Sequence, residues 1–288
     1  MNKFTGNKPI SVAVKIAIVL TVDIVLNRII PNEFLQFDHR GYFDKMFNNQ
    51  PLSLVECFYM IWNRDIRLFV IYLFIIVIVI RVLYRYRFNR EDNFQLSKHT
   101  AVVASICFIP AIIGYAYMMH YQYQHGVLYL ESQLIYFFRQ LYIVGLFEEL
   151  VYRGYIANEL FKLKDSGLKT PVAIVISAVL FWFSHIQGAV VSALFFGMPF
   201  SIMQWGFWEQ FLSVAFFGAA MAVILFYRKD IVSLICIHAA HNILLDSYIG
   251  SSQSILMGAL YGVFYTVAVV CYPAILIYKA RKRRSVYN

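Results

Sequence analysis

Long apolar stretches recur from one end of this 288-residue sequence to the other, and they constrain its fold more than any other feature. A helix needs about 20 such residues to cross the roughly 30 Å hydrocarbon core of a bilayer. Because lipid cannot satisfy free backbone groups and no barrel-like alternation is present, we expect each stretch to be helical. The predicted spans lie at about 10–30, 66–85, 101–119, 134–161, 171–187, 209–227, 231–248 and 255–278.

The fold class that follows is all-α, a polytopic transmembrane helical bundle of about eight spans with both termini cytoplasmic. Only 14% of the residues are charged, against about 25% in a soluble domain, so no room is left for a large soluble domain. We therefore expect residues 1–288 to form a single integral membrane domain. The four cysteines show no CxxC spacing, which argues against a thiolate metal site or a disulfide framework.

The net charge of +9 reflects basic residues that cluster between the apolar stretches. Such clusters mark cytoplasmic loops, so we expect no nucleic-acid partner and instead contact with the lipid bilayer. The dense clusters follow the second, fourth, sixth and eighth predicted spans, whereas segments 120–133, 188–207 and 249–254 contain no Lys or Arg. This asymmetry places the basic loops and both termini on the cytoplasmic side.

The densest group of charged residues in any predicted span lies in the fourth, where the stretch GLFEELVYRGY contains Glu148, Glu149 and Arg153. Charges inside a span cost about 2.5–3.5 kcal/mol each on insertion scales, so their presence needs a reason. The i,i+4 spacing lets Arg153 pair with Glu149, which leaves the Glu148 carboxylate to face a cavity. A poorly solvated carboxylate without its own cation suits a general base. The competing interpretation is a purely structural buried ion network.

Two further spans carry polar residues at helical spacing. Phe181 and His185 lie one turn apart in the fifth span, and His238 and Asn242 lie one turn apart in the seventh. A lone intramembrane histidine is usually a packed, hydrogen-bonded core residue, but polar groups on three spans favour a shared site. A count of 1.5 Å per residue puts Glu148 and His185 about 20 Å from the cytoplasmic surface and His238 only ~11 Å.

These residue types suit hydrolysis of an amide by an activated water. A Glu and a His can deprotonate the water, while a second His and an Asn can donate hydrogen bonds to the oxyanion. The sequence contains no HExxH, GxSxG, P-loop or GxGxxG pattern. Glu148, His185 and His238 would also be acceptable zinc ligands, so zinc stays an alternative to the cofactor-free mechanism that we expect.

The sequence resembles the CAAX-protease and bacteriocin-processing (CPBP, or Abi) family of intramembrane endopeptidases. The family motifs EExxxR, FxxxH and HxxxN occur here in family order and on separate apolar spans, and the resemblance marks residues 134–248 as the catalytic core. The matching positions are Glu148, Glu149 and Arg153, then Phe181 and His185, then His238 and Asn242.

The resemblance implies a role for each motif residue. Glu148 would be the catalytic base acting with His185, and His238 and Asn242 would form the oxyanion hole. His241, which lacks an Asn or Asp four residues on, is expected only to pack between helices or at the edge of a cavity. The residues implied to support the site are Glu149, Arg153 and Phe181.

The sequence thus predicts an intramembrane glutamate endopeptidase that cuts a peptide or a membrane-associated protein. We expect a multi-pass location in the cell membrane, most simply a bacterial plasma membrane. Two alternatives stay open at this stage. One is a catalytically silent immunity or regulatory protein that acts by binding; the other is a transporter, for which an inverted repeat would argue, and none is found.

The predicted topology can be tested by labelling with a membrane-impermeant maleimide in a variant that lacks the native cysteines. A cysteine placed at Gly126 should react in intact cells, because segment 120–133 is predicted to face outward. A cysteine placed at Ser285 should react only after the cells are opened. The reverse pattern would mean that the orientation is inverted.

Overall fold

The computed structural model describes residues 8–29, 67–88, 97–126, 137–196 and 205–287, and every regular element within these ranges is helical. This confirms the predicted all-α fold. The helices are α1 (Lys8–Ile29), α4 (Arg67–Phe74), η2 (Ile75–Leu83), α6 (Lys98–Gln124), η3 (Gln140–Ala157), α8 (Asn158–Lys162), η4 (Leu163–Ser166), α9 (Thr170–Phe196), α10 (Trp205–Arg228), α11 (Ile231–Gly250), α12 (Ile255–Tyr265), η5 (Thr266–Cys271) and α13 (Tyr272–Tyr287).

Each predicted apolar span coincides with one helix or with helices in immediate succession. Within the described residues, five helices are long and apolar enough to cross a membrane, and two apolar helices are shorter. The chain is therefore a multi-pass membrane protein. The five long segments are Lys8–Leu26, Lys98–Gln124, Phe207–Arg228, Ile231–Gly250 and Ile255–Arg283, and the shorter ones are Phe69–Leu83 and Thr170–Ile186.

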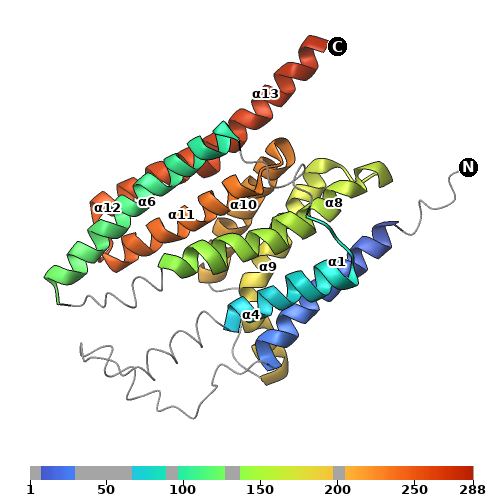
Figure 1. Cartoon of the computed structure of the whole chain (residues 1–288), viewed down its shortest axis with the longest axis horizontal. Helices are drawn as coiled ribbons and strands as arrows, with labels where there is room; N and C mark the ends of the chain where they lie inside the picture. The colour runs from blue at the N-terminus through green and yellow to red at the C-terminus, as the bar shows by residue number, and fades with distance from the viewer. Residues whose placement is uncertain (1–7, 30–66, 89–96, 127–136, 197–204, 288) are drawn as a thin grey trace, which may run out of the picture.

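The span count of eight and the cytoplasmic termini stay predictions. Figure 1 shows the start of α1 and the end of α13 toward the same end of the bundle. The predicted outward segments 120–133 and 188–208 lie partly outside the described residues, and their remaining parts belong to the ends of α6, α9 and α10. Which side of the membrane each end faces therefore still rests on the basic clusters.

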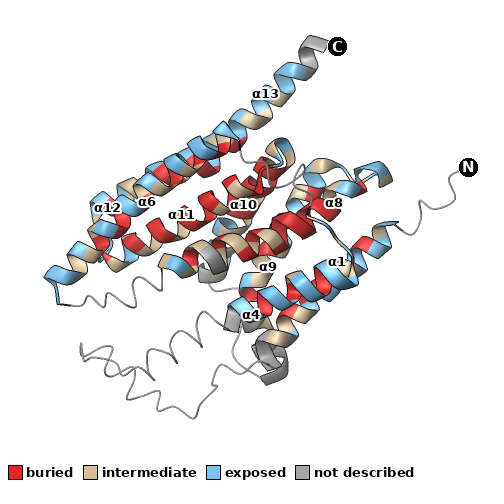
Figure 2. Ribbon diagram, in the orientation of Figure 1, coloured by how far each residue is buried: buried red, intermediate tan, exposed pale blue. Residues whose placement is uncertain are grey.

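Helix α11 lies at the centre of the bundle. It packs against α6 and η3, and it also contacts α10 and α12. Figure 2 shows buried residues along α11 and η3, whereas the outer faces of α6, α12 and α13 are exposed. Those outer faces carry large apolar side chains such as Ile109 of α6 and Ile255 of α12, at 59% and 91% exposure. Apolar surface of this extent is typical of a lipid-facing belt.

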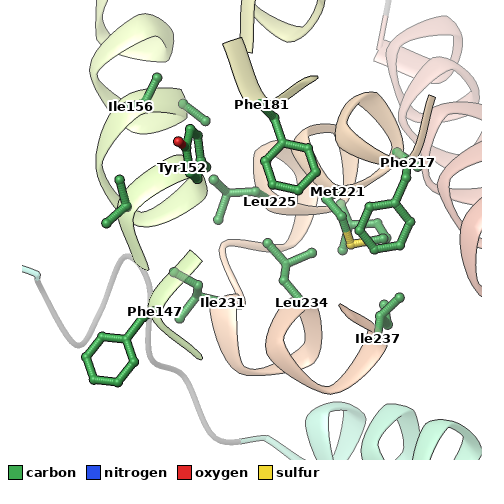
Figure 3. Packing of buried hydrophobic residues seen from close by; sticks show 14 of the residues in the cluster. Phe147, Tyr152, Ile156, Phe181, Phe217, Met221, Leu225, Ile231, Leu234 and Ile237 are labelled. Carbon is green, nitrogen blue, oxygen red and sulfur yellow. The ribbon is translucent and has the colours of Figure 1, made fainter. Parts of the chain in front are cut away.

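The core joins η3, α9, α10 and α11 through large apolar side chains. Figure 3 shows Tyr152 and Ile156 of η3, Phe181 of α9, and Met221 and Leu225 of α10 close together in this region. All five are almost fully buried. Their packing holds together the helices that carry the EExxxR and FxxxH motifs.

Polar caps fix the point where α6 and α11 begin. Ser97 and Thr100 form a capping box at the start of α6, with each side chain hydrogen-bonded to the other residue's backbone N–H. Asp230 caps α11 by accepting from the Ser233 backbone N–H at 3.1 Å and the Ser233 hydroxyl at 2.6 Å. Asp230 also accepts from the Thr100 hydroxyl at 2.8 Å, which links the two caps.

Gly114 of α6 faces α11 and α12 closely. A Cβ atom at Gly114 would lie 2.7 Å from Met257 Cε and 2.9 Å from Leu244 Cδ2. Such distances are too short for van der Waals contact, so a larger residue would force the ends of these two side chains to shift. Packing of this kind holds α11 in its central position.

Removing the shared cap should destabilise the bundle. Asp230→Ala deletes the acceptor of three hydrogen bonds in a buried setting, which should cost at least about 2 kcal/mol. The expected result is a lower Tm in detergent. The control is Asp165→Ala, because Asp165 is exposed. An equal Tm for both variants would show that the cap contributes nothing.

Candidate active site

The EExxxR motif lies on η3, which is wound with the wider i→i+5 hydrogen-bond pattern of a π-helix over Gln140–Ala157. Such turns are rare and occur often at functional sites. Glu149 and Arg153 on this helix are fully buried, at 0% exposure each. Two opposite charges are thus held in the interior by their own pairing.

Glu149 is the acceptor that joins two motifs. Its Oε1 accepts from Arg153 Nη1 at 3.0 Å and from His238 Nδ1 at 2.7 Å. The predicted Glu149–Arg153 pair is confirmed. The bond to His238 was not predicted, because counting the rise per residue had placed His238 nearer the cytoplasmic surface than Glu148 and His185. That count assumed straight helices perpendicular to the membrane, and the crossing of η3 with α11 overrides it.

Phe181 lies where the three motifs meet. The Arg153 guanidinium lies over its ring at 3.8 Å, a cation–π contact in a buried setting. The same ring packs edge-on against His185 and His238, with centroid distances of 4.7 and 5.9 Å. Phe181 therefore positions a charge and two imidazoles at once, which accounts for a phenylalanine within a polar motif.

The two motif histidines both have Nδ1 bound within the protein and Nε2 free to contact a substrate or a water. His185 Nδ1 lies 2.9 Å from the Phe181 carbonyl oxygen, and His238 Nδ1 lies 2.7 Å from Glu149 Oε1. A carbonyl or a carboxylate can only accept, so each Nδ1 carries the proton. Nε2 is then the nitrogen left to meet a substrate or a water. The Ser184 hydroxyl, 3.3 Å from His185 Nδ1, leaves this assignment unchanged.

A cavity of about 660 Å³ opens between α9, α10, α11 and the α12–η5 helix. His185, His238 and Asn242 all line it, so the structure brings three of the four predicted catalytic residues to one space. Aromatic side chains form much of its wall, and Glu209 and Ser213 of α10 add polar groups. The remaining lining residues are Phe181, Val214, Phe217, His241, Leu245, Tyr261, Gly262, Tyr265 and Thr266.

Glu148 differs from its predicted position, because it is not among the residues that line this cavity. Its carboxylate is close enough to interact electrostatically with Tyr72 of α4, Asp23 of α1 and His238. Its Oε2 atom is buried and has no hydrogen-bond partner among the described residues. Glu148 is thus the carboxylate that the Arg153 pair leaves over, as predicted, but it does not line the cavity.

Asp23 and Tyr261 of this region escaped the sequence analysis, whereas His241 was placed correctly. His241 lies in the cavity wall, where its ring stacks on the Phe217 ring with a centroid distance of 4.6 Å. Its Nδ1 atom lies 3.3 Å from the Tyr261 hydroxyl oxygen. Its predicted place at a cavity edge is therefore correct. Asp23 is a buried carboxylate in the first apolar span, and that placement alone could have marked it as a candidate. Tyr261 carries no comparable sequence pattern.

Within the residues that the structure describes, no group of three or more His, Cys, Asp or Glu side chains is arranged to hold a metal ion. Glu149, which contacts His238, already binds Arg153. The cofactor-free mechanism and its zinc alternative both stay predictions.

Comparison with known proteins agrees with this geometry. Residues 130–244 match the family model described as type II CAAX prenyl endopeptidase Rce1-like. This segment is Rce1-like. It contains all three motifs and nearly coincides with the predicted core at 134–248, so the resemblance to the CPBP family is confirmed. The family that this model describes is one of CAAX prenyl endopeptidases, and this segment resembles it. No curated protein and no solved structure matched the chain.

Arg153→Ala in the Rce1-like region should lower both protein abundance and activity. Removing one partner of a buried ion pair leaves an uncompensated charge and typically costs about 3–5 kcal/mol. Abundance is measured by immunoblot of membranes and stability by Tm in detergent, with Arg283→Ala, at an exposed position, as control. Normal abundance and Tm would show that the Glu149–Arg153–His238 network does not support the fold.

Proposed function

We propose that the protein is an intramembrane endopeptidase that hydrolyses a peptide bond with water activated by Glu148 and His185. The observation that carries this proposal is the meeting of the three motifs. His185, His238 and Asn242 share one cavity, and Glu149 hydrogen-bonds His238 across the helix interface. A buried network that served stability alone would not require three polar groups on a common cavity wall.

The base would be formed by two groups on different helices. The Nε2 lone pair of His185 can accept a proton from water, since its Nδ1 donates to the Phe181 carbonyl. Glu148 adjoins Glu149, and it lies within electrostatic reach of His238. No residue binds its Oε2 atom, so rotation of the side chain toward the cavity would give up the hydrogen bond with Tyr72 but none at Oε2. We infer that Glu148 makes this rotation when substrate and water enter.

The oxyanion would be held by α11. Asn242 follows His238 by one helical turn, and both line the cavity, so their side chains can reach one substrate oxygen. His238 must carry protons on both ring nitrogens to donate from Nε2. Glu149 accepts from its Nδ1, so the role of Glu149 and Arg153 is to hold the His238 ring in the orientation that favours the tetrahedral intermediate.

The cavity wall indicates the class of substrate. Phe181, Phe217, Tyr261 and Tyr265 give it an aromatic lining, which suits an apolar segment of a peptide or of a membrane-associated protein. Exclusion of bulk water by this lining strengthens the dipoles that act on the scissile bond. We propose a peptide substrate that approaches from the membrane rather than a soluble one.

The test compares Glu148→Gln with Glu149→Gln in purified full-length protein. Glu148→Gln should lower kcat by a factor on the order of 10²–10⁴, the usual contribution of a general base, with an unchanged Tm. Glu149→Gln should lower the Tm as well, because a neutral amide cannot compensate Arg153. Activity is followed on a candidate substrate found uncut in membranes of cells that carry Glu148→Gln. Asp165→Asn is the control at an exposed position.

Retained proteolysis in Glu148→Gln would overturn the assignment of the base. The alternative outcome is that wild type and Glu148→Gln give identical membrane peptidomes while both still bind the same protein or peptide. The protein would then act by binding, as an immunity or regulatory protein does.

The metal-free mechanism makes a separate prediction. Activity should persist in EDTA or 1,10-phenanthroline, since the proposed base and oxyanion donors are all side chains of the protein. Loss of activity that added Zn²⁺ restores would instead assign Glu148, His185 and His238 as ligands.

A further inference from the structure

A second cavity, of about 520 Å³, lies away from the candidate active site. It is formed by α1, by the segment 84–87 that follows η2, and by the end of η3 together with α8. Figure 1 shows this segment passing between α1 and the region of α8, at the end of the bundle where α1 begins. The lining residues are Lys15, Tyr84, Arg85, Tyr86, Arg87, Tyr155, Glu159 and Lys162.

The charge in this cavity is strongly positive. Four of the lining side chains are basic and one is acidic. Glu159 is already bound by Lys162, at 2.6 Å, so it does not neutralise the other three. Among the described residues, neither Arg85 nor Arg87 forms an ion pair, and both side chains are exposed. Such a concentration of cations at a membrane surface attracts an anion.

The backbone holds these arginines in place. Arg85 has φ +51°, a left-handed conformation that is uncommon for a residue other than glycine. The flanking tyrosines anchor the turn: the Tyr84 hydroxyl donates to the Lys15 carbonyl at 3.4 Å, and the Tyr86 hydroxyl donates to the Gly154 carbonyl at 2.8 Å. An unusual conformation that is fixed from both sides is typical of a functional turn.

Tyr155 supplies an independent observation. Its side chain is 1% exposed, and its ring packs against Tyr86 at 5.0 Å and Tyr84 at 6.0 Å. Its hydroxyl is buried and has no hydrogen-bond partner among the described residues, yet the residue lines the cavity. A buried hydroxyl without a partner is unfavourable, and a ligand that accepts its hydrogen bond would remove that cost.

We propose that this cavity binds a phosphate group, as carried by the headgroup of an anionic membrane lipid. Arg85 and Arg87 would bind the phosphate oxygens through their planar guanidinium groups, and Lys15 would add a point charge. The Tyr155 hydroxyl would donate to the same group. The apolar outer surface of the adjacent α1 offers a path for acyl chains, with Ile10 and Val14 exposed at 65% and 51%. The proposal is independent of the peptidase activity.

Binding is measured with the purified full-length protein in detergent by the rise in Tm as ligand is added. The probes are short-chain phosphatidylglycerol, which is anionic, short-chain phosphatidylcholine, which is zwitterionic, and inorganic phosphate. Phosphatidylglycerol should raise the Tm progressively with the logarithm of its concentration, and phosphatidylcholine should not. Arg85→Gln with Arg87→Gln should weaken this binding on the order of 25-fold, since each basic residue near the surface contributes about fivefold.

Tyr155→Phe provides the sharper variant, because it removes only the hydroxyl. Without ligand, its Tm should equal or exceed that of wild type, since an unsatisfied group is lost. Its affinity for phosphatidylglycerol should fall by about tenfold. The matched control combines Arg281→Gln with Arg283→Gln, which removes two exposed basic residues of α13 and should leave binding unchanged.

A further outcome is that inorganic phosphate also raises the Tm, with the rise weakened by the same substitutions at Arg85, Arg87 and Tyr155. This result would support the phosphate site and identify a soluble phosphate compound as its ligand. Equal Tm shifts with both lipids, or binding that none of these substitutions weakens, would overturn the proposal.

Discussion

Glu149, whose side chain is fully buried, accepts one hydrogen bond from Arg153 of its own helix and another from His238 of α11. The arrangement constrains the rest of the site. A buried carboxylate is tolerated only with such partners, so η3 and α11 must lie at the distance that these bonds require. Phe181 closes the arrangement from α9, where its ring lies against the Arg153 guanidinium. The three motifs are thereby held in one unit at the middle of the bundle.

The contacts that hold α11 in place also link the Glu149 network to the rest of the fold. The shared cap of Asp230 and Thr100 fixes where α11 begins, and Gly114 permits its close contact with α6. Because α11 carries His238, His241 and Asn242, these structural contacts also shape the cavity. Outside it, the exposed apolar faces of α6 and α12 are suited to lipid. A rigid polar centre inside an apolar shell is an arrangement in which hydrolysis can proceed away from bulk water.

The sequence and the structure agree on the pairing of Glu149 with Arg153 and on the gathering of His185, His238 and Asn242. They differ on Glu148, which lies beside Tyr72 and Asp23. The motif spacing could not reveal this position, because spacing along one helix says which residues share a face but not which neighbour that face meets. Asp23 and Tyr72 lie outside the Rce1-like segment, so the first spans contribute groups beside the proposed base that the motifs do not mention.

The sequence alone determined the helical, membrane-embedded class of the fold and singled out the residues that we propose to carry the chemistry. Both follow from local physics: lipid leaves helices as the way for these apolar stretches to satisfy their backbone, and charges within them require a compensating reason. Only the tertiary structure decided that His238 binds Glu149, that His241 and Tyr261 line the same cavity, and that the cations of 84–87 meet Lys15 and Tyr155. Those relations depend on how helices distant in the sequence cross. The crossing is set by side-chain packing over the whole bundle, which no single motif encodes.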